Sequence, residues 1–205
     1  KLGTPLQFYR ECAYYASKGM VAVSVDYRIE YLHHSTPFDS FEDAKDAICW
    51  LRSHASDYQL DPDKIAVAGG SAGGHLAAAL GTIGSDEAVN YRPNLSVLYY
   101  PVVDMVSRGY GFPEIKRDFE KISPIHHVSE ATPSTLILLG TKDPIVSVET
   151  IRSYQDKLLQ KGVDCELHLF EGAGHPIFLY RKPLTEDYYK VRKLTNDFLK
   201  REGFL

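Results

Sequence analysis

The sequence predicts an α/β fold in which a mostly parallel β-sheet is covered by helices on both faces. Short runs of aliphatic and β-branched residues alternate along the chain with segments whose apolar residues recur at helical spacing. The predicted strands are apolar almost throughout, which is typical of strands buried on both faces. In addition, Ser71, Asp143 and His175 each follow a different predicted strand closely. The carboxyl ends of parallel strands are where such sheets bind ligands.

Length and composition suit one domain, predicted to span residues 1–205. The formal net charge of −4 and the lack of a basic block argue against a nucleic-acid partner or an anionic membrane surface. No apolar run in the sequence is long enough to cross a bilayer. Neither the three widely spaced cysteines nor the pair His33-His34 has the spacing of a metal site, so no metal is predicted.

The first part of the chain is predicted to alternate helix, strand, helix and strand. The first helix carries Phe8, Cys12 and Tyr15 on one face and ends at a glycine. Residues 21–25 are predicted to be a buried strand because they are mostly β-branched. The next helix is expected to begin near Asp39-Ser40 and to place Trp50 in the core. Residues 64–68 are the strand that leads into the serine turn.

The second part continues the alternation of strands and helices. The predicted elements are strands at 95–100, 135–139 and 166–170, and helices at 148–160 and around 188–198. Residues 104–133 differ, because their periodicity is weak and they contain several prolines. An irregular segment of this length is often a binding loop, so a cap or lid is predicted there.

The turn Gly69-Gly70-Ser71-Ala72-Gly73 matches the pattern Gly-x-Ser-x-Gly between a predicted strand and a predicted helix. In that setting a sharp turn strains the serine backbone and points its hydroxyl outward. We expect Gly69 and Gly73 to be required because a Cβ at either position would clash. The backbone N–H of Ala72, at the start of the helix, is predicted to stabilise negative charge that develops beside Ser71.

A serine nucleophile needs a base, and a histidine base needs an acceptor that orients its ring. His175 follows the last predicted strand in a glycine-rich loop, and Asp143 follows the strand before it. The order serine, aspartate, histidine fits this type of turn. Asp104 and Glu171 are alternative acids. His75, four residues after the serine, is interpreted as a core histidine.

Several stretches together make the chain resemble the α/β-hydrolase esterases of the acetyl-esterase and xylan-esterase type. The matching stretches are Gly19–Arg28, Glu42–Arg52, Asp61–Ile65, Gly69–Gly74, Gly140–Asp143 and Gly174–His175. The resemblance implies an enzyme that removes short acyl groups, acetyl above all, from carbohydrates such as xylan. It implies the triad Ser71, His175 and Asp143, the Ala72 N–H in the oxyanion hole, and no cofactor.

The family also has three further strands and a His-Gly-Gly-Gly-type loop that supplies other oxyanion donors. The sequence from Lys1 resembles what normally follows that loop. The resemblance therefore implies an upstream segment, leaves the compartment open, and predicts that residues 1–205 alone catalyse poorly.

The predicted function is a serine esterase that acts on a small-molecule or carbohydrate ester through an acyl-enzyme. A serine exopeptidase of the prolyl-oligopeptidase type is an alternative, because it shares the fold and the triad. A binding protein on a hydrolase scaffold is the alternative from a different class.

Overall fold

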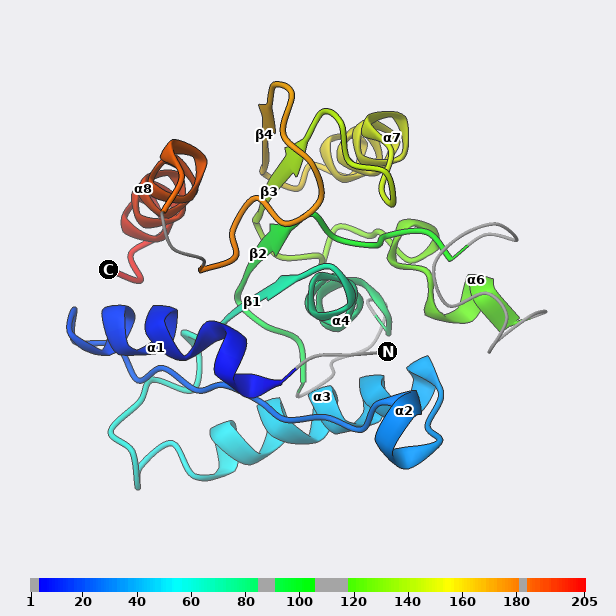
Figure 1. Ribbon diagram of the computed structural model, residues 1–205. Coiled ribbons are helices and arrows are strands. Elements are labelled where there is room, and N and C mark those ends of the chain that lie inside the picture. Colours follow the sequence, from blue (N-terminus) through cyan, green and yellow to red (C-terminus); the bar gives the residue numbers. More distant parts are fainter. Residues whose placement is uncertain (1–3, 85–90, 106–117, 181–183) are drawn as a thin grey trace.

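The computed structural model describes residues 4–84, 91–105, 118–180 and 184–205 (Figure 1). Within these ranges, one sheet contains strands in the order β1-β2-β3-β4, and each neighbouring pair is parallel. The strands are β1 (Ala66–Gly70), β2 (Leu95–Tyr99), β3 (Thr135–Gly140) and β4 (Cys165–Phe170). The predicted parallel sheet is confirmed, and its four strands lie within two residues of the expected bounds.

Helices cover both faces of the sheet, as predicted. In Figure 1, α1 (Tyr9–Ala16) and α8 (Glu186–Arg201) lie on one side, while α3 (Pro37–Ser53), α4 (Ala72–Thr82) and α7 (Val148–Gln160) lie on the other. The shorter helical turns are η1 (Pro5–Phe8), α2 (Glu30–His33), α6 (Phe119–Ile122) and η3 (Pro124–His126). In the part of the chain that the structure describes, no helix has the length and apolarity needed to cross a membrane.

The core is centred on β2 and β3, in which every residue is buried. Helix α4 packs on β1 and β2, and it is buried from Gly74 to its last residue. Its small side chains, such as Ala78 and Ala79, let the helix approach the sheet closely. The serine turn is thus built between two elements that packing holds firmly.

Helix α3 begins and packs differently from the expectation. Thr36, rather than Asp39-Ser40, is the N-cap, and it forms a capping box with Asp39 ahead of a proline at the first helical position. The buried side chains of α3 are Phe41, Ala44 and Ile48. The prediction that Trp50 lies in the core is wrong. It points away from that face, is 47% exposed and stacks on His54.

The strand predicted at residues 21–25 is absent, although all five residues are described. These residues pair with no strand among the described residues, and Val21 and Val23 are 48% and 51% exposed. A strand needs a neighbour about 4.8 Å away to exchange hydrogen bonds. Between this segment and β1 there is instead a cavity of about 620 Å³.

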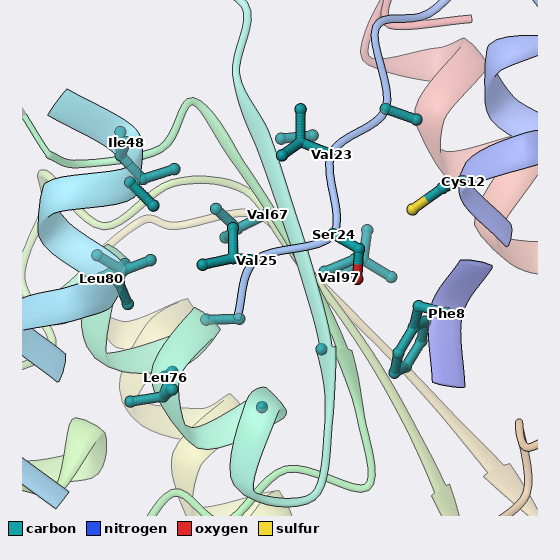
Figure 2. A pocket seen from close by; sticks show the side chains of 18 of the residues that line it. Phe8, Cys12, Val23, Ser24, Val25, Ile48, Val67, Leu76, Leu80 and Val97 are labelled. Carbon is teal, nitrogen blue, oxygen red and sulfur yellow. The ribbon is translucent and has the colours of Figure 1, made fainter. Parts of the chain in front are cut away.

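Figure 2 shows this cavity between α1 and the α3–α4 layer. Phe8 and Cys12 line it on one side, and Ile48, Leu76 and Leu80 line it on the other. Because of the cavity, β1 has β2 as its only strand neighbour among the described residues. The sheet therefore ends at β1 in this structure, and residues 21–25 do not extend it.

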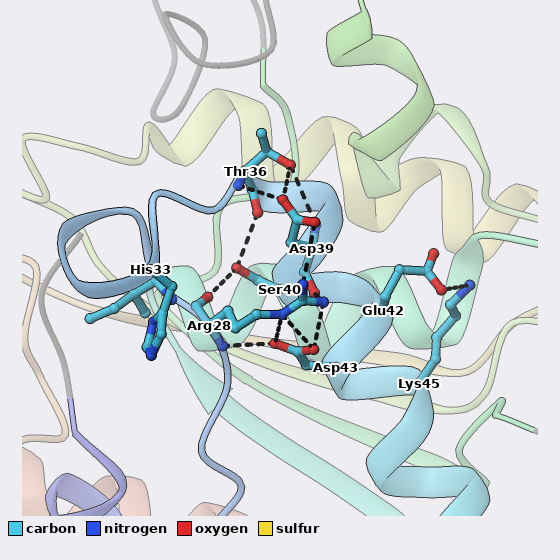
Figure 3. Close-up of polar contacts among 9 residues, drawn as sticks. Arg28, His33, Thr36, Asp39, Ser40, Glu42, Asp43 and Lys45 are labelled. Carbon is cyan, nitrogen blue, oxygen red and sulfur yellow. Dashed lines mark hydrogen bonds and ion pairs between the residues drawn. The ribbon is translucent and has the colours of Figure 1, made fainter.

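Polar contacts fix the far end of this segment to α3 (Figure 3). The Arg28 backbone N–H donates to Asp43 Oδ2 at 2.7 Å, and Arg28 Nε donates to Asp43 Oδ1 at 2.9 Å. Arg28 Nη2 also lies 2.8 Å from Asp43 Oδ1. The Ser40 hydroxyl donates to the Arg28 carbonyl at 2.7 Å. The pKa of Asp43 is lowered, mainly by its hydrogen bond from Arg28. This cluster keeps the segment in place without a ladder of strand hydrogen bonds.

The predicted cap or lid at 104–133 lies partly outside the described residues, which exclude 106–117. Its described part contains α6 and η3. The lid therefore stays a prediction, as does the assignment of residues 1–205 to one domain.

Candidate active site

Ser71 occupies the sharp turn between β1 and α4. Its backbone φ is 54° and its ψ is −115°, a conformation that residues with a side chain rarely adopt. Two backbone bonds hold it. The Ser71 N–H donates to the Tyr99 carbonyl at 3.0 Å, and the Ser71 carbonyl accepts from the His75 N–H at 2.9 Å. The turn is thus secured by the end of β2 and by the first turn of α4.

The close packing at this turn excludes a Cβ at Gly69 but not at Gly73. A Cβ on Gly69 would lie 2.2 Å from the Gly73 carbonyl oxygen, whereas a Cβ on Gly73 would meet nothing within 4 Å. The expectation of a clash is therefore confirmed for Gly69 and wrong for Gly73. Gly74 is also crowded, because its Cβ would lie 3.0 Å from Cα of Pro101.

The structure brings Ser71, His175 and Asp143 together in one hydrogen-bonded line. His175 Nε2 lies 2.8 Å from Ser71 Oγ, and His175 Nδ1 lies 2.7 Å from Asp143 Oδ2. The Asp143 side chain is fully buried and that of His175 is 14% exposed. With the proton on Nδ1 facing the carboxylate, Nε2 is free to accept the serine hydroxyl proton.

Asp143 is held in position by its other carboxylate oxygen. Asp143 Oδ1 accepts the backbone N–H groups of Ile145 at 2.8 Å and Val146 at 2.9 Å. These bonds close an Asx turn directly after β3. They leave Oδ2 facing the imidazole. Asp143 therefore both forms the turn with Pro144 and accepts the hydrogen bond that orients His175.

The loops that carry Asp143 and His175 are bound to each other. The Lys142 N–H donates to the Ala173 carbonyl at 2.9 Å, and the Gly172 N–H donates to the Thr141 hydroxyl at 2.8 Å. A Cβ on Gly140 would lie 2.3 Å from the Ala173 carbonyl oxygen. Gly140 is therefore what allows the two loops to approach.

The alternative acids lie elsewhere. Asp104 faces His126, with 3.9 Å between Oδ1 and Nε2, and Glu171 is exposed. His75 is a buried core histidine, as interpreted. Its Nδ1 lies 3.0 Å from the Val102 carbonyl oxygen, and burial lowers its pKa to about 4.

The N-terminus of α4 lies at the serine. Ala72 is its first residue, so its backbone N–H is one of those that have no partner within the helix. The positive end of the helix dipole adds to this N–H. Among the described residues, no group of three His, Cys, Asp or Glu side chains could hold a metal ion.

Sequence reasoning missed Tyr100. This residue follows β2 directly, and its ring lies edge-on to His175 with 4.8 Å between the ring centroids. Its position in the sequence could have indicated it. Tyr100 directly follows a predicted strand, and such residues lie at the same edge of the sheet as Ser71, Asp143 and His175.

Comparison with known proteins gives relatives that include ester hydrolases. The chain is 30% identical to the probable carboxylic ester hydrolase LipM of Mycobacterium tuberculosis over 71% of this chain and 39% of LipM. It is 25% identical to an acetylxylan esterase of Xylanibacter ruminicola over 87% of this chain and 40% of that protein. The chain thus spans about two fifths of the length of these curated relatives.

Solved structures agree with the fold. The chain superposes over its whole length on 80% of Thermogutta terrifontis esterase 2 phosphoramylated by tabun, with a TM-score of 0.93 and 36% identity. The same esterase is also solved with propionate bound and with butyrate bound. The parallel sheet, the covering helices and these neighbours establish the α/β-hydrolase fold. Finally, the BD-FAE family matches residues 5–116, more than half of the chain, and the chain therefore belongs to the BD-FAE family.

Proposed function

We propose that this chain is the catalytic part of a serine ester hydrolase. The observation that carries the proposal is the continuous line of hydrogen bonds from Asp143 through His175 to Ser71, at 2.7 Å and 2.8 Å. Membership of a family whose relatives include named esterases supports it. The strained turn at Ser71 gives the proposal a second, structural support.

In the proposed mechanism, Ser71 Oγ attacks the ester carbonyl carbon while its proton passes to His175 Nε2. The carbonyl oxygen becomes an oxyanion that the Ala72 N–H and the α4 dipole stabilise. The C–O bond to the alcohol then breaks, and His175 gives its proton to the leaving alcohol. Water, deprotonated by His175, attacks the acyl-enzyme and releases the carboxylic acid and free Ser71.

The proposed substrates are esters of short acyl groups, including acetyl groups on carbohydrates such as xylan. The esterase solved with propionate bound and with butyrate bound supports a short acyl chain. The acetylxylan esterase among the relatives supports the carbohydrate alcohol. No cofactor takes part in this proposal.

Covalent labelling by a fluorophosphonate tests the proposal. The protein should become labelled at Ser71, and the Ser71→Ala variant should take up no label while its unfolding temperature stays nearly unchanged. Failure of the full-length wild-type protein to be labelled would show a binding protein on a hydrolase scaffold and overturn the enzyme proposal.

A substrate panel distinguishes the esterase from the exopeptidase. We expect hydrolysis of p-nitrophenyl acetate and of acetylated xylan, with lower kcat/KM for longer acyl chains. Faster hydrolysis of aminoacyl-anilides than of these esters would favour the exopeptidase of the prolyl-oligopeptidase type instead.

A further inference from the structure

Tyr100 adopts an unfavourable backbone conformation beside the proposed triad. Its φ is 40°, in the left-handed region that residues with a Cβ avoid unless their surroundings hold them there. The Tyr100 N–H donates to the Leu138 carbonyl at 2.7 Å. On its other side, Pro101 packs closely against Gly74 of α4. The end of β2 is therefore held so that the Tyr100 side chain turns towards the site.

The Tyr100 ring fills the space between His175 and the residue before the serine. It meets the imidazole edge-on, with an interplanar angle of 63° and 4.8 Å between centroids. It is only 6% exposed. At its far end, Tyr100 Oη and Cζ would lie 2.7 Å and 2.9 Å from a Cβ on Gly70. Gly70 thus leaves the space that the phenol occupies.

The contacts of this side chain are made by the ring. Burial first, and the negative charge of Asp143 second, raise the pKa of Tyr100 to about 12, so the hydroxyl stays neutral at neutral pH. The phenol therefore neither adds a charge to the site nor takes a proton from His175.

The two hydrogen bonds of His175 still allow its ring one kind of rotation. An imidazole bonded at Nδ1 and Nε2 can still tilt about the line that joins these bonds, and tilting weakens both. A rigid aromatic edge packed against the imidazole blocks that motion. We propose that Tyr100 is a positioning residue, whose ring holds the His175 imidazole in line with Ser71 and Asp143. This inference rests on the proposed esterase function.

Three variants test the role of the ring. Tyr100→Phe keeps the ring and removes the hydroxyl, Tyr100→Ala removes both, and Tyr100→Leu fills the space without an aromatic edge should the alanine variant fail to fold. Tyr154→Ala is the matched control, because Tyr154 is 1% exposed and belongs to α7, which supplies none of the three residues of the line.

The readouts are kcat and KM for p-nitrophenyl acetate, and the low-field proton resonance of the His175 N–H shared with Asp143. Tyr100→Phe should keep kcat within about threefold and keep the resonance. Tyr100→Ala and Tyr100→Leu should lose about 10²-fold in kcat, with KM little changed, because small misplacements of reacting groups cost that much. Their resonance should broaden or vanish. Tyr154→Ala should lower the unfolding temperature and leave the resonance intact.

Two results would overturn the inference. An equal loss in Tyr100→Phe and Tyr100→Ala would show that the hydroxyl, not the ring, acts. Retention of kcat and of the resonance in both Tyr100→Ala and Tyr100→Leu would show that the ring positions nothing. The two proposals can fail separately, because the resonance can be measured without turnover. If fluorophosphonate fails to label the wild-type protein, the esterase proposal is refuted, and the resonance still tests the contact between Tyr100 and His175.

A double-mutant cycle adds an independent test. The Cβ introduced by Gly70→Ala should push the phenol away and lower kcat in the protein that contains Tyr100. In the Tyr100→Ala background the same change should have much less effect. Additive losses in the two variants would contradict the inference.

Discussion

At the scale of single residues, Asp143 has two tasks, one for each carboxylate oxygen. Oδ1 closes the turn after β3 and Oδ2 faces His175. In Asp143→Asn the amide can still close the turn, but its NH₂ group faces Nδ1 and favours the wrong tautomer. We expect kcat to fall about 10⁴-fold, as loss of a triad aspartate does elsewhere, with little change in stability. Steady-state kinetics and thermal unfolding measure both.

The control for this prediction is Asp104→Asn, because Asp104 is the alternative acid and faces His126. It should keep the wild-type kcat. Wild-type turnover in Asp143→Asn would remove Asp143 from the mechanism.

His75 makes a prediction about stability rather than activity. Its pKa is lowered to about 4 by burial, against 6.5 for a free histidine. Below pH 6.5, His75 therefore binds a proton in the unfolded chain, whereas in the folded chain it binds one only near pH 4. His75 should make the free energy of unfolding fall by up to about 3 kcal/mol across that window as the pH is lowered.

Urea unfolding between pH 7 and pH 4 tests this, with His75→Gln as the variant that cannot titrate there. The fall in unfolding free energy should be smaller in His75→Gln. The same pH dependence in both proteins would contradict the assignment of the effect to His75.

At the scale of elements, the junction of β1 and α4 packs differently around Gly69 and Gly73, although the two glycines look equivalent in the motif. Gly69→Ala should cost about 3 kcal/mol, because its Cβ would lie 2.2 Å from a backbone oxygen and the helix must shift. Gly73→Ala should stabilise the protein by up to about 1 kcal/mol, because alanine is the better helix former and its Cβ meets nothing. Unfolding in urea compares the two, and equal effects would show that the junction does not pack as described.

At the scale of the whole molecule, packing is loose at the cavity beside β1 and tight in the rest of the core. Val67 lines the cavity of about 620 Å³, while Val191 of α8 is fully buried outside its lining. An added methylene in a close-packed core costs about 1–3 kcal/mol. Val191→Ile should therefore destabilise the protein by that amount, and Val67→Ile should be neutral or stabilising. Equal costs in urea unfolding would mean that the space beside β1 is filled in solution.

The sequence by itself determined the parallel sheet, the positions of its four strands along the chain, most helices and three side chains at one sheet edge. These depend on local signals. Apolar runs mark buried strands, helical spacing marks covering helices, and the glycine-rich serine turn marks a strand-to-helix junction. Since parallel strands end at a common edge, residues that follow them closely are brought near one another.

Only the tertiary structure decided which of these residues meet. Ser71 and His175 are 104 positions apart, and their 2.8 Å contact depends on how two loops pack around Gly140. Packing also placed Trp50 outside the core, left residues 21–25 beside a cavity, and turned the Tyr100 ring towards His175. The physical reason is that a local pattern records what a residue prefers, whereas contacts and empty space depend on segments that are distant in the chain.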